Sequence, residues 1–153
     1  METGLLHTHS FLRWIILLLL LIAVFRHLTA GSRVFNTTDK RVGLFLLISA
    51  DLMLLIGIYQ WAFGKTWGLI SLKERGFREV MRDDAARFFA VEHFVGMIVA
   101  IVMIHIGRSY AKRTMPDSLK HKRSLLFYGL ALLIILVFIP WPFRLVGAGR
   151  GWF

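Results

Sequence analysis

Apolar residues are grouped along the chain in four long blocks that are separated by polar and charged stretches. The blocks cover residues 5–28, 42–63, 88–107 and 124–143. A helix needs about 20 mostly apolar residues to cross the hydrocarbon layer of a bilayer, because each residue adds about 1.5 Å. We therefore predict an all-α fold in which residues 1–153 form a single transmembrane domain, an integral membrane four-helix bundle.

The stretch between the second and third blocks has a helical pattern of its own. The sequence SLKE at 71–74 resembles a capping box, and Phe77, Val80 and Met81 follow at helical spacing among basic residues. This pattern predicts a short interfacial helix that leads into the third span, with a solvated loop as the alternative.

Composition supports a membrane protein and changes how the charge is interpreted. Hydrophobic residues make up 57% of the 153 residues, more than a soluble domain of this length can bury. The net charge of +10 would suggest nucleic acid in a soluble protein. Here the basic residues lie between the apolar blocks, where they meet lipid headgroups, so we expect a lipid bilayer and no nucleic acid as partner.

Because Arg26 and His27 close the first block, we interpret it as a retained helix and not a signal peptide.

Two features predict the orientation of the spans. The tryptophans Trp14, Trp61, Trp67, Trp141 and Trp152 all fall on the side that carries both termini and residues 64–87, as interfacial anchors should. The opposite side holds ten of the 19 Lys and Arg residues, in two short loops with little acidic compensation. We therefore predict a multi-pass protein of the bacterial inner (cytoplasmic) membrane, with the basic loops in the cytoplasm and both termini outside.

Ionisable residues in or beside the predicted spans are costly in lipid and are functional candidates by default. The outer cluster consists of His7, His9, Arg13, Glu92 and His93, and the inner cluster of His27, His105 and His121. The chain contains no cysteine, so a metal or cofactor has to be held by His, Met, carboxylates or backbone.

His9 and His93 are expected at similar depth on facing helices. Two such imidazoles are what bis-histidine ligation of a b-type haem requires, which makes these two residues the candidate metal ligands. Arg13, Arg87 and Arg144 are placed to bind the haem propionates. Small residues such as those at 57 and 96 could let a flat macrocycle lie against the backbone.

The inner cluster offers a second haem site, formed by His27 with His105 or His121, so the sequence predicts one haem b or two. The alternative is that histidines near helix ends form interfacial hydrogen bonds only. The Arg13 side chain has alternatives as well: it could snorkel toward the headgroups or pair with Glu92. The His-x-His pair at 7–9 could bind copper or nickel, but the sequence shows no third ligand.

Asp51 lies near the middle of the second span, with no cation at matching depth on any other span. An ionised carboxylate there is very expensive, which predicts a protonated side chain or a polar cavity. A role in proton relay or at a quinone site competes with a buried hydrogen bond to a neighbour such as Ser49.

Four motifs in the chain resemble those of a known family. They are HTHSFLRW at 7–14, RFFAVEH at 87–93, KHK at 120–122 and IPWPFR at 139–144. In this order they are similar to the motifs of small four-helix membrane proteins of Bacteroidetes-type bacteria that are commonly labelled cytochrome b. The resemblance covers nearly the whole chain and implies haem binding and electron transfer. The positions that match the family motifs are His7, His9, Arg13, His93, His121 and Arg144. Relatives often carry a histidine near the position of Asp51, which puts a second haem in doubt.

These features favour a membrane-embedded b-type haem protein that transfers electrons between quinol and a partner in a respiratory chain. Such an electron-transfer cytochrome has both axial positions filled, so we expect no catalytic residue that converts a substrate. One alternative is a haem-free structural or assembly subunit of a membrane complex. Another is a proton or metal carrier that uses Asp51, Glu92 and the His7–His9 pair. Quinone, other membrane subunits and further copies of the chain are the candidate partners besides lipid.

Overall fold

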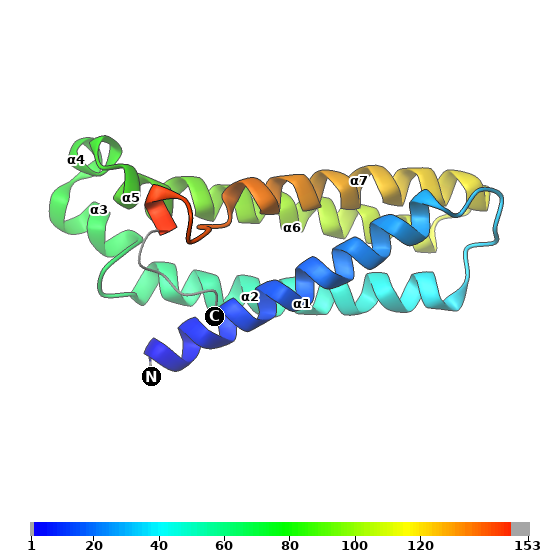
Figure 1. The fold of residues 1–153 in the computed structure, drawn as a ribbon, viewed down its shortest axis with the longest axis horizontal. Helices are drawn as coiled ribbons and strands as arrows, with labels where there is room; N and C mark the ends of the chain where they lie inside the picture. Colours follow the sequence, from blue (N-terminus) through cyan, green and yellow to red (C-terminus); the bar gives the residue numbers. More distant parts are fainter. Residues whose placement is uncertain (1, 148–153) are drawn as a thin grey trace.

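The computed structural model of the protein describes residues 2–147, which form a bundle of four long helices with three short helices at one end (Figure 1). The long helices are α1 (Glu2–Leu28), α2 (Thr37–Phe63), α6 (His93–Ser109) and α7 (Asp117–Phe138). The short helices are α3 (Leu69–Arg75), α4 (Phe77–Arg82) and α5 (Asp84–Arg87). A π-helical turn, η1 (Phe88–Glu92), joins α5 to α6, and 3-10 turns η2 (Tyr110–Lys112) and η3 (Leu145–Gly147) follow α6 and α7. No strand occurs within residues 2–147, which confirms the all-α prediction.

The long helices run alternately up and down around one axis. Each packs against two neighbours, in the cyclic order α1, α2, α6, α7. As a result, α1 lies diagonally opposite α6. The start of α1 and the chain after α7 lie at the same end as α3, α4 and α5 (Figure 1). Short connections join α1 to α2 and α6 to α7 at the other end, as in other up-and-down bundles.

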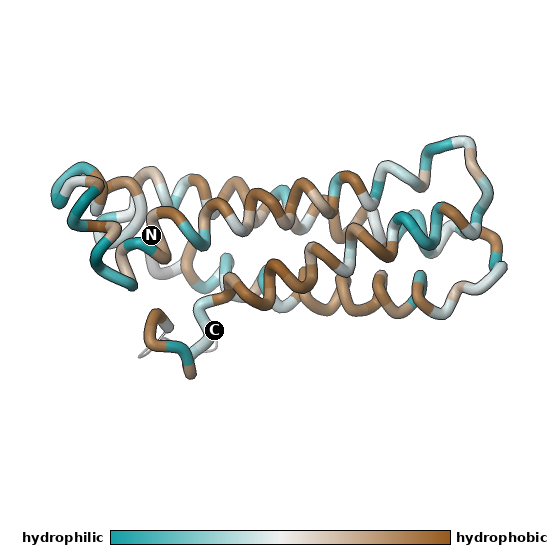
Figure 2. The backbone as a smooth tube through the Cα atoms, turned by 90° about the horizontal axis from the view of Figure 1, so that it is seen from above, coloured by the Kyte–Doolittle hydropathy of each residue, from teal (hydrophilic) through white to brown (hydrophobic). Residues whose placement is uncertain are grey.

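Four segments of the described chain are long and apolar enough to cross a membrane. They are Gly4–Leu28, Thr37–Phe63, Asp84–Lys112 and Asp117–Phe138. Apolar residues dominate the middle of the bundle, and hydrophilic residues gather toward its two ends (Figure 2). Large apolar side chains such as Phe25, Leu55 and Leu133 are exposed on its outside. Because lipid is the solvent that suits such a surface, the chain is a multi-pass membrane protein.

The predicted spans fall on the four long helical segments, whose bounds differ from the predicted ones, most of all in the fourth. The prediction places this span at 124–143, whereas α7 begins at Asp117 and ends at Phe138. The start is earlier because the charged first turns of the helix extend beyond the apolar block. The end is earlier because Pro140 disfavours helical backbone in the preceding residue, and Ile139 is extended (φ −71°, ψ 131°).

The segment between α2 and α6 is helical, in three short pieces and not in one amphipathic helix. Gly76 separates α3 from α4 with a φ of +78°, a left-handed backbone conformation that favours glycine. The predicted capping box at 71–74 does not form, because α3 begins earlier, at Leu69. Ser71 instead donates a hydrogen bond from its hydroxyl to the carbonyl of Thr66 (3.1 Å).

Each long helix buries one alanine in the core of the bundle, at most 1% exposed: Ala23, Ala50, Ala100 and Ala131. Small side chains let membrane-spanning helices approach closely. Leu20, Leu46 and Ile104 fill the space between them. Toward the end with α3, α4 and α5 the helices surround a cavity, whose lining extends to Ala50 and Ile104.

A buried carboxylate fixes the connection between α1 and α2. The side chain of Asp39 has no exposed area and accepts hydrogen bonds from Arg26 Nε (2.9 Å) and Arg33 Nη1 (2.8 Å). Asp39 also accepts from the backbone N–H of Asn36 (3.0 Å), while Asn36 Oδ1 accepts from the N–H of Asp39 (3.1 Å). This reciprocal pair is the capping box that starts α2 five positions before the predicted span.

We predict that Asp39→Ala lowers the free energy of unfolding by about 1–3 kcal/mol, because it removes a helix cap and the shared partner of two guanidinium groups. Thermal unfolding of the detergent-purified protein, followed by circular dichroism, measures the change. The control is Glu79→Ala, which removes an exposed pair with Arg75 on α4 and α3. It should cost less than about 0.5 kcal/mol. Equal losses in the two variants would contradict the role given to Asp39.

Candidate functional site

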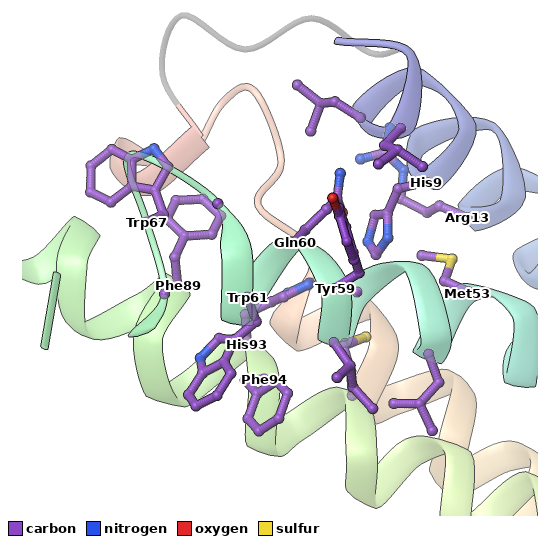
Figure 3. Close-up of a pocket in the computed structure, with 18 of the residues that line it drawn as sticks. His9, Arg13, Met53, Tyr59, Gln60, Trp61, Trp67, Phe89, His93 and Phe94 are labelled. Atoms are coloured by element: carbon purple, nitrogen blue, oxygen red, sulfur yellow. The ribbon is translucent and has the colours of Figure 1, made fainter. Parts of the chain in front are cut away.

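The half of the bundle next to α3, α4 and α5 contains a cavity of about 670 Å³. This volume lies within the range of about 300–1,000 Å³ that is typical of ligand and cofactor sites. Most of the lining is apolar or aromatic, and the polar side chains that reach it include His9, Arg13 and His93. His9 and Arg13 belong to α1, and His93 belongs to α6 (Figure 3). The cavity therefore brings together the main members of the predicted outer cluster.

His9 presents a buried nitrogen that no group of the described residues satisfies. Its Nδ1 has no hydrogen-bond partner within the described residues. Leaving such an atom buried and unpaired costs about 1–3 kcal/mol. The ring lies against α2, where a Cβ on Gly57 would be 3.4 Å from its Cε1 atom. A ligand in the cavity is one way to satisfy this nitrogen. His7, in contrast, is exposed and is not among the residues that line the cavity.

The orientation of His93 depends on the end of α7. Carbonyl groups in the last turn of a helix have no partner within the helix. For Phe138 the residue four positions on is Pro142, which has no N–H to offer. His93 Nδ1 lies 2.7 Å from this carbonyl oxygen. Because a carbonyl only accepts, Nδ1 carries the hydrogen, and in the neutral ring Nε2 carries the lone pair.

The same helix end explains the other polar residues of the IPWPFR motif. Pro140 stands four positions after Leu136, whose carbonyl accepts from the indole Nε1 of Trp141 (2.9 Å). Arg144 donates to the carbonyl of Val137. The motif therefore ends α7 and supplies donors for the carbonyls that this ending leaves unpaired.

A π-helical turn directly precedes His93. The N–H of His93 bonds to the carbonyl of Phe88, five residues back instead of four. Such turns are rare and occur frequently at functional sites. Trp61 of α2 donates from its indole to the carbonyl of Ala90 in this turn (2.9 Å), and its ring stacks on Phe94 (centroids 4.5 Å apart). Trp61 therefore ties α2 to the turn that sets the direction of His93, a role that nothing in the sequence indicated.

The two imidazoles of His9 and His93 lie at a separation that a shared metal ion could use. Their ring centroids are 6.4 Å apart and their planes are inclined by 56°. A metal–imidazole bond is about 2.0–2.1 Å long, so two rings that bind one ion from opposite sides have centroids about 6 Å apart. The ring separation, the buried Nδ1 of His9 and the cavity volume are all compatible with a bis-histidine haem.

The three arginines predicted to bind propionates have different surroundings. Arg13 lines the cavity, with its guanidinium 5.3 Å from the ring centroid of Trp14. Arg87 and Arg144 are not among the lining residues. Arg87 donates to Glu92 (2.6 Å), so the alternative in which Glu92 pairs with Arg13 is not observed. Arg144 lies over the ring of Phe88 while it binds carbonyls of α7.

The inner histidines form a hydrogen-bonded pair and do not leave space for a metal between them. The Nδ1 atoms of His27 and His121 are 2.8 Å apart, whereas an ion bound by both would hold them about 4 Å apart. His121 Nε2 lies 3.1 Å from the carbonyl of Arg33, so it donates there and its Nδ1 accepts from His27. The rings of Phe35 and Tyr128 stack on His27. This cluster attaches the α1–α2 connection to α7 and does not resemble a second haem site.

Asp51 has a partner that the sequence analysis missed. The expectation named no partner for Asp51 on another span, but His105 of α6 lies with Nε2 2.8 Å from Asp51 Oδ1. The pairing also removes His105 from the second haem site, since it reaches toward α2 and not toward His27. A hydrogen bond to Ser49 does not explain Asp51.

Within residues 2–147 no group of three or more His, Asp or Glu side chains is placed to hold a metal ion. Copper or nickel binding by His7 and His9 therefore gains no third ligand from the described part of the chain. Trp152, predicted as an interfacial anchor, lies outside the described residues.

A comparison of the chain with family models, with curated proteins and with solved structures found no match.

We predict that Gly96→Ala destabilises the protein by about 1–3 kcal/mol through overpacking between α6 and α7. A Cβ at Gly96 would lie 2.5 Å from Phe138 Cδ2, so the residue that holds His93 has to move. The matched control is Gly129→Ala in α7, where an added Cβ meets nothing within 4 Å. That change should stabilise the helix by about 0.5–1 kcal/mol. Thermal unfolding of both variants in detergent should give shifts of opposite sign, and a stabilised Gly96→Ala variant would contradict the packing described.

Proposed function

We propose that the protein binds one b-type haem in the cavity between α1 and α6 and transfers electrons within the membrane, with His9 and His93 as the two axial ligands. The observation that carries the proposal is the pair of imidazoles across this cavity, with centroids 6.4 Å apart. His9 contributes a buried nitrogen without a partner among the described residues, which a metal ion would satisfy.

The hydrogen bond of His93 also supports a ligand role. Metal-binding histidines usually donate their second ring N–H to a carbonyl or carboxylate, which fixes the tautomer and the direction of the ring. His93 has this arrangement through Phe138 (2.7 Å), and in the neutral ring its Nε2 carries the lone pair.

The other lining residues would give the cofactor its surroundings. When bound, haem would supply reversible one-electron transfer with both axial positions occupied. Arg13 is the arginine best placed to pair with its carboxylates, because it is the only one of the three predicted arginines that lines the cavity. Met53, Met97 and Phe94 would exclude water from the faces of a flat macrocycle.

The positions of the family motifs agree with this proposal. HTHSFLRW supplies His9 and Arg13, RFFAVEH supplies His93, and IPWPFR supplies Pro140 of the cavity wall. Three of the four motifs that resemble the small cytochrome b family thus meet at one cavity. We propose that the chain is a cytochrome of that kind and that it receives electrons from quinol in the bilayer and passes them to a respiratory partner.

We further propose that the protein resides in the bacterial inner membrane with the cavity near its outer side. Arg26, Arg33, Arg108 and Arg123 lie at the end of the bundle opposite α3, α4 and α5. Because Lys and Arg are retained in the cytoplasm, this basic end would face inward and both termini would face outward.

The direct test is an absorption spectrum of the detergent-purified protein, recorded oxidised and after reduction with dithionite. The proposal predicts a Soret band, sharp α and β bands on reduction, and one haem per chain by the pyridine haemochrome assay. A colourless protein that is folded and fully recovered from the membrane, even when haem is supplied, would contradict it and favour a haem-free subunit.

Variants of single histidines test the ligand assignment. His9→Ala and His93→Ala each remove one axial ligand, so both should lose most of the bound haem. His7→Ala and His105→Ala are the matched controls, because neither residue lines the cavity, and both should keep about one haem per chain. Full haem retention in His93→Ala would refute the assignment, provided that thermal unfolding shows all four variants to be folded.

A further inference from the structure

The hydrogen-bonded pair of Asp51 and His105 lies on the outside of the membrane-spanning part of the bundle. The side chain of Asp51 is 43% exposed and that of His105 is 49% exposed. Asp51 lies ten residues from Arg41 and twelve from Phe63 along α2, so its short side chain is far from both ends of the helix. Around the pair the exposed residues of the same face are apolar, including Leu55 of α2 and Val102 of α6.

A carboxylate–imidazole pair that faces lipid is unusual. Ionisable side chains within the membrane almost always face a bundle interior or a water-filled cavity, because lipid offers them no hydrogen bonds. The cavity beside His9 does not include either residue. The α2/α6 face, defined by Asp51, Leu55, Val102 and His105, is therefore expected to be covered by another protein surface.

The hydrogen-bonding groups of the Asp51–His105 pair can match those of the same pair in a second copy of the protein. As a neutral unit it holds one proton between Asp51 Oδ1 and His105 Nε2, either as an acid with a neutral imidazole or as an ion pair. In both forms Nδ1 of His105 carries a hydrogen and is a donor, and Oδ2 of Asp51 is an acceptor. Neither atom has another hydrogen bond among the described residues. Two copies related by a twofold axis along the membrane normal would match each donor with an acceptor.

We propose that the α2/α6 face is a homodimer interface, in which His105 Nδ1 of each copy donates to Asp51 Oδ2 of the other. The interface lies outside the cavity, so it does not depend on the haem proposal. It would also shield the only carboxylate found in the middle of a described span.

Cysteine crosslinking in vesicles tests this interface. The natural chain has no cysteine, so each introduced thiol is unique. Leu55→Cys and Val102→Cys chains with different affinity tags are mixed and reconstituted in phosphatidylethanolamine/phosphatidylglycerol vesicles without other proteins. In an antiparallel helix pair these positions come to similar depth on opposite copies, so mild oxidation should give a crosslinked heterodimer. Leu21→Cys of α1 mixed with Leu126→Cys of α7 is the control, because both are similarly exposed and lie at similar depth but on other faces.

Adding Asp51→Leu and His105→Leu to both crosslinking chains should lower the yield about tenfold, since two interhelical hydrogen bonds are lost and each contributes about a factor of three. The exchanged variant, Asp51→His with His105→Asp, keeps the donor and acceptor pattern and should restore crosslinking. The proposal is overturned if the Leu55/Val102 mixture gives no more product than the control. It is also overturned if removing the pair leaves the yield unchanged, or if the face crosslinks only when a different protein is present.

Discussion

Backbone carbonyls at the end of a membrane-spanning helix need hydrogen-bond donors from the protein, because lipid supplies none. The end of α7 makes this need acute, since Pro140 and Pro142 offer no N–H. One of the donors is the imidazole of His93 on a neighbouring helix. The residue that satisfies the end of α7 is therefore also the residue that faces His9 across the cavity, and the geometry of the site follows from how this helix ends.

The two ends of the bundle use the same residue type for different purposes. At the basic end, His27 donates a hydrogen bond to His121, beside the buried carboxylate of Asp39, and the two residues hold a connection in place. At the other end, His9 and His93 line the cavity, with ring centroids 6.4 Å apart. The surroundings of the two pairs differ: the ring of His27 stacks on Phe35 and Tyr128, whereas the pair at the other end borders a cavity.

The sequence alone predicted the elements better than the contacts between them. The length and hydropathy of the apolar blocks were sufficient to predict four spans. The similar depth expected for His9 and His93 was sufficient to predict that these two residues lie close together. Depth does not determine how each helix is rotated about its axis, and so it does not show which side chains face each other. For this reason the Asp51–His105 pair was missed. For the same reason Arg87 and Arg144 were assigned to the cavity. The π-helical turn shifts the register after Phe88 without any sequence signal. The carbonyl of Phe138 as a partner for His93 could have been anticipated, because the prolines that leave it unpaired are visible in the sequence.

In the proposed site, His9 and His93 would bind one iron from opposite sides. Low-temperature electron paramagnetic resonance of the air-oxidised, detergent-purified protein reads this axial ligation directly. We expect a low-spin ferric signal that accounts for one iron per chain, because two imidazoles give a strong ligand field. A predominantly high-spin signal from a folded sample would mean that one axial position lacks a histidine and would contradict the pairing of His9 with His93.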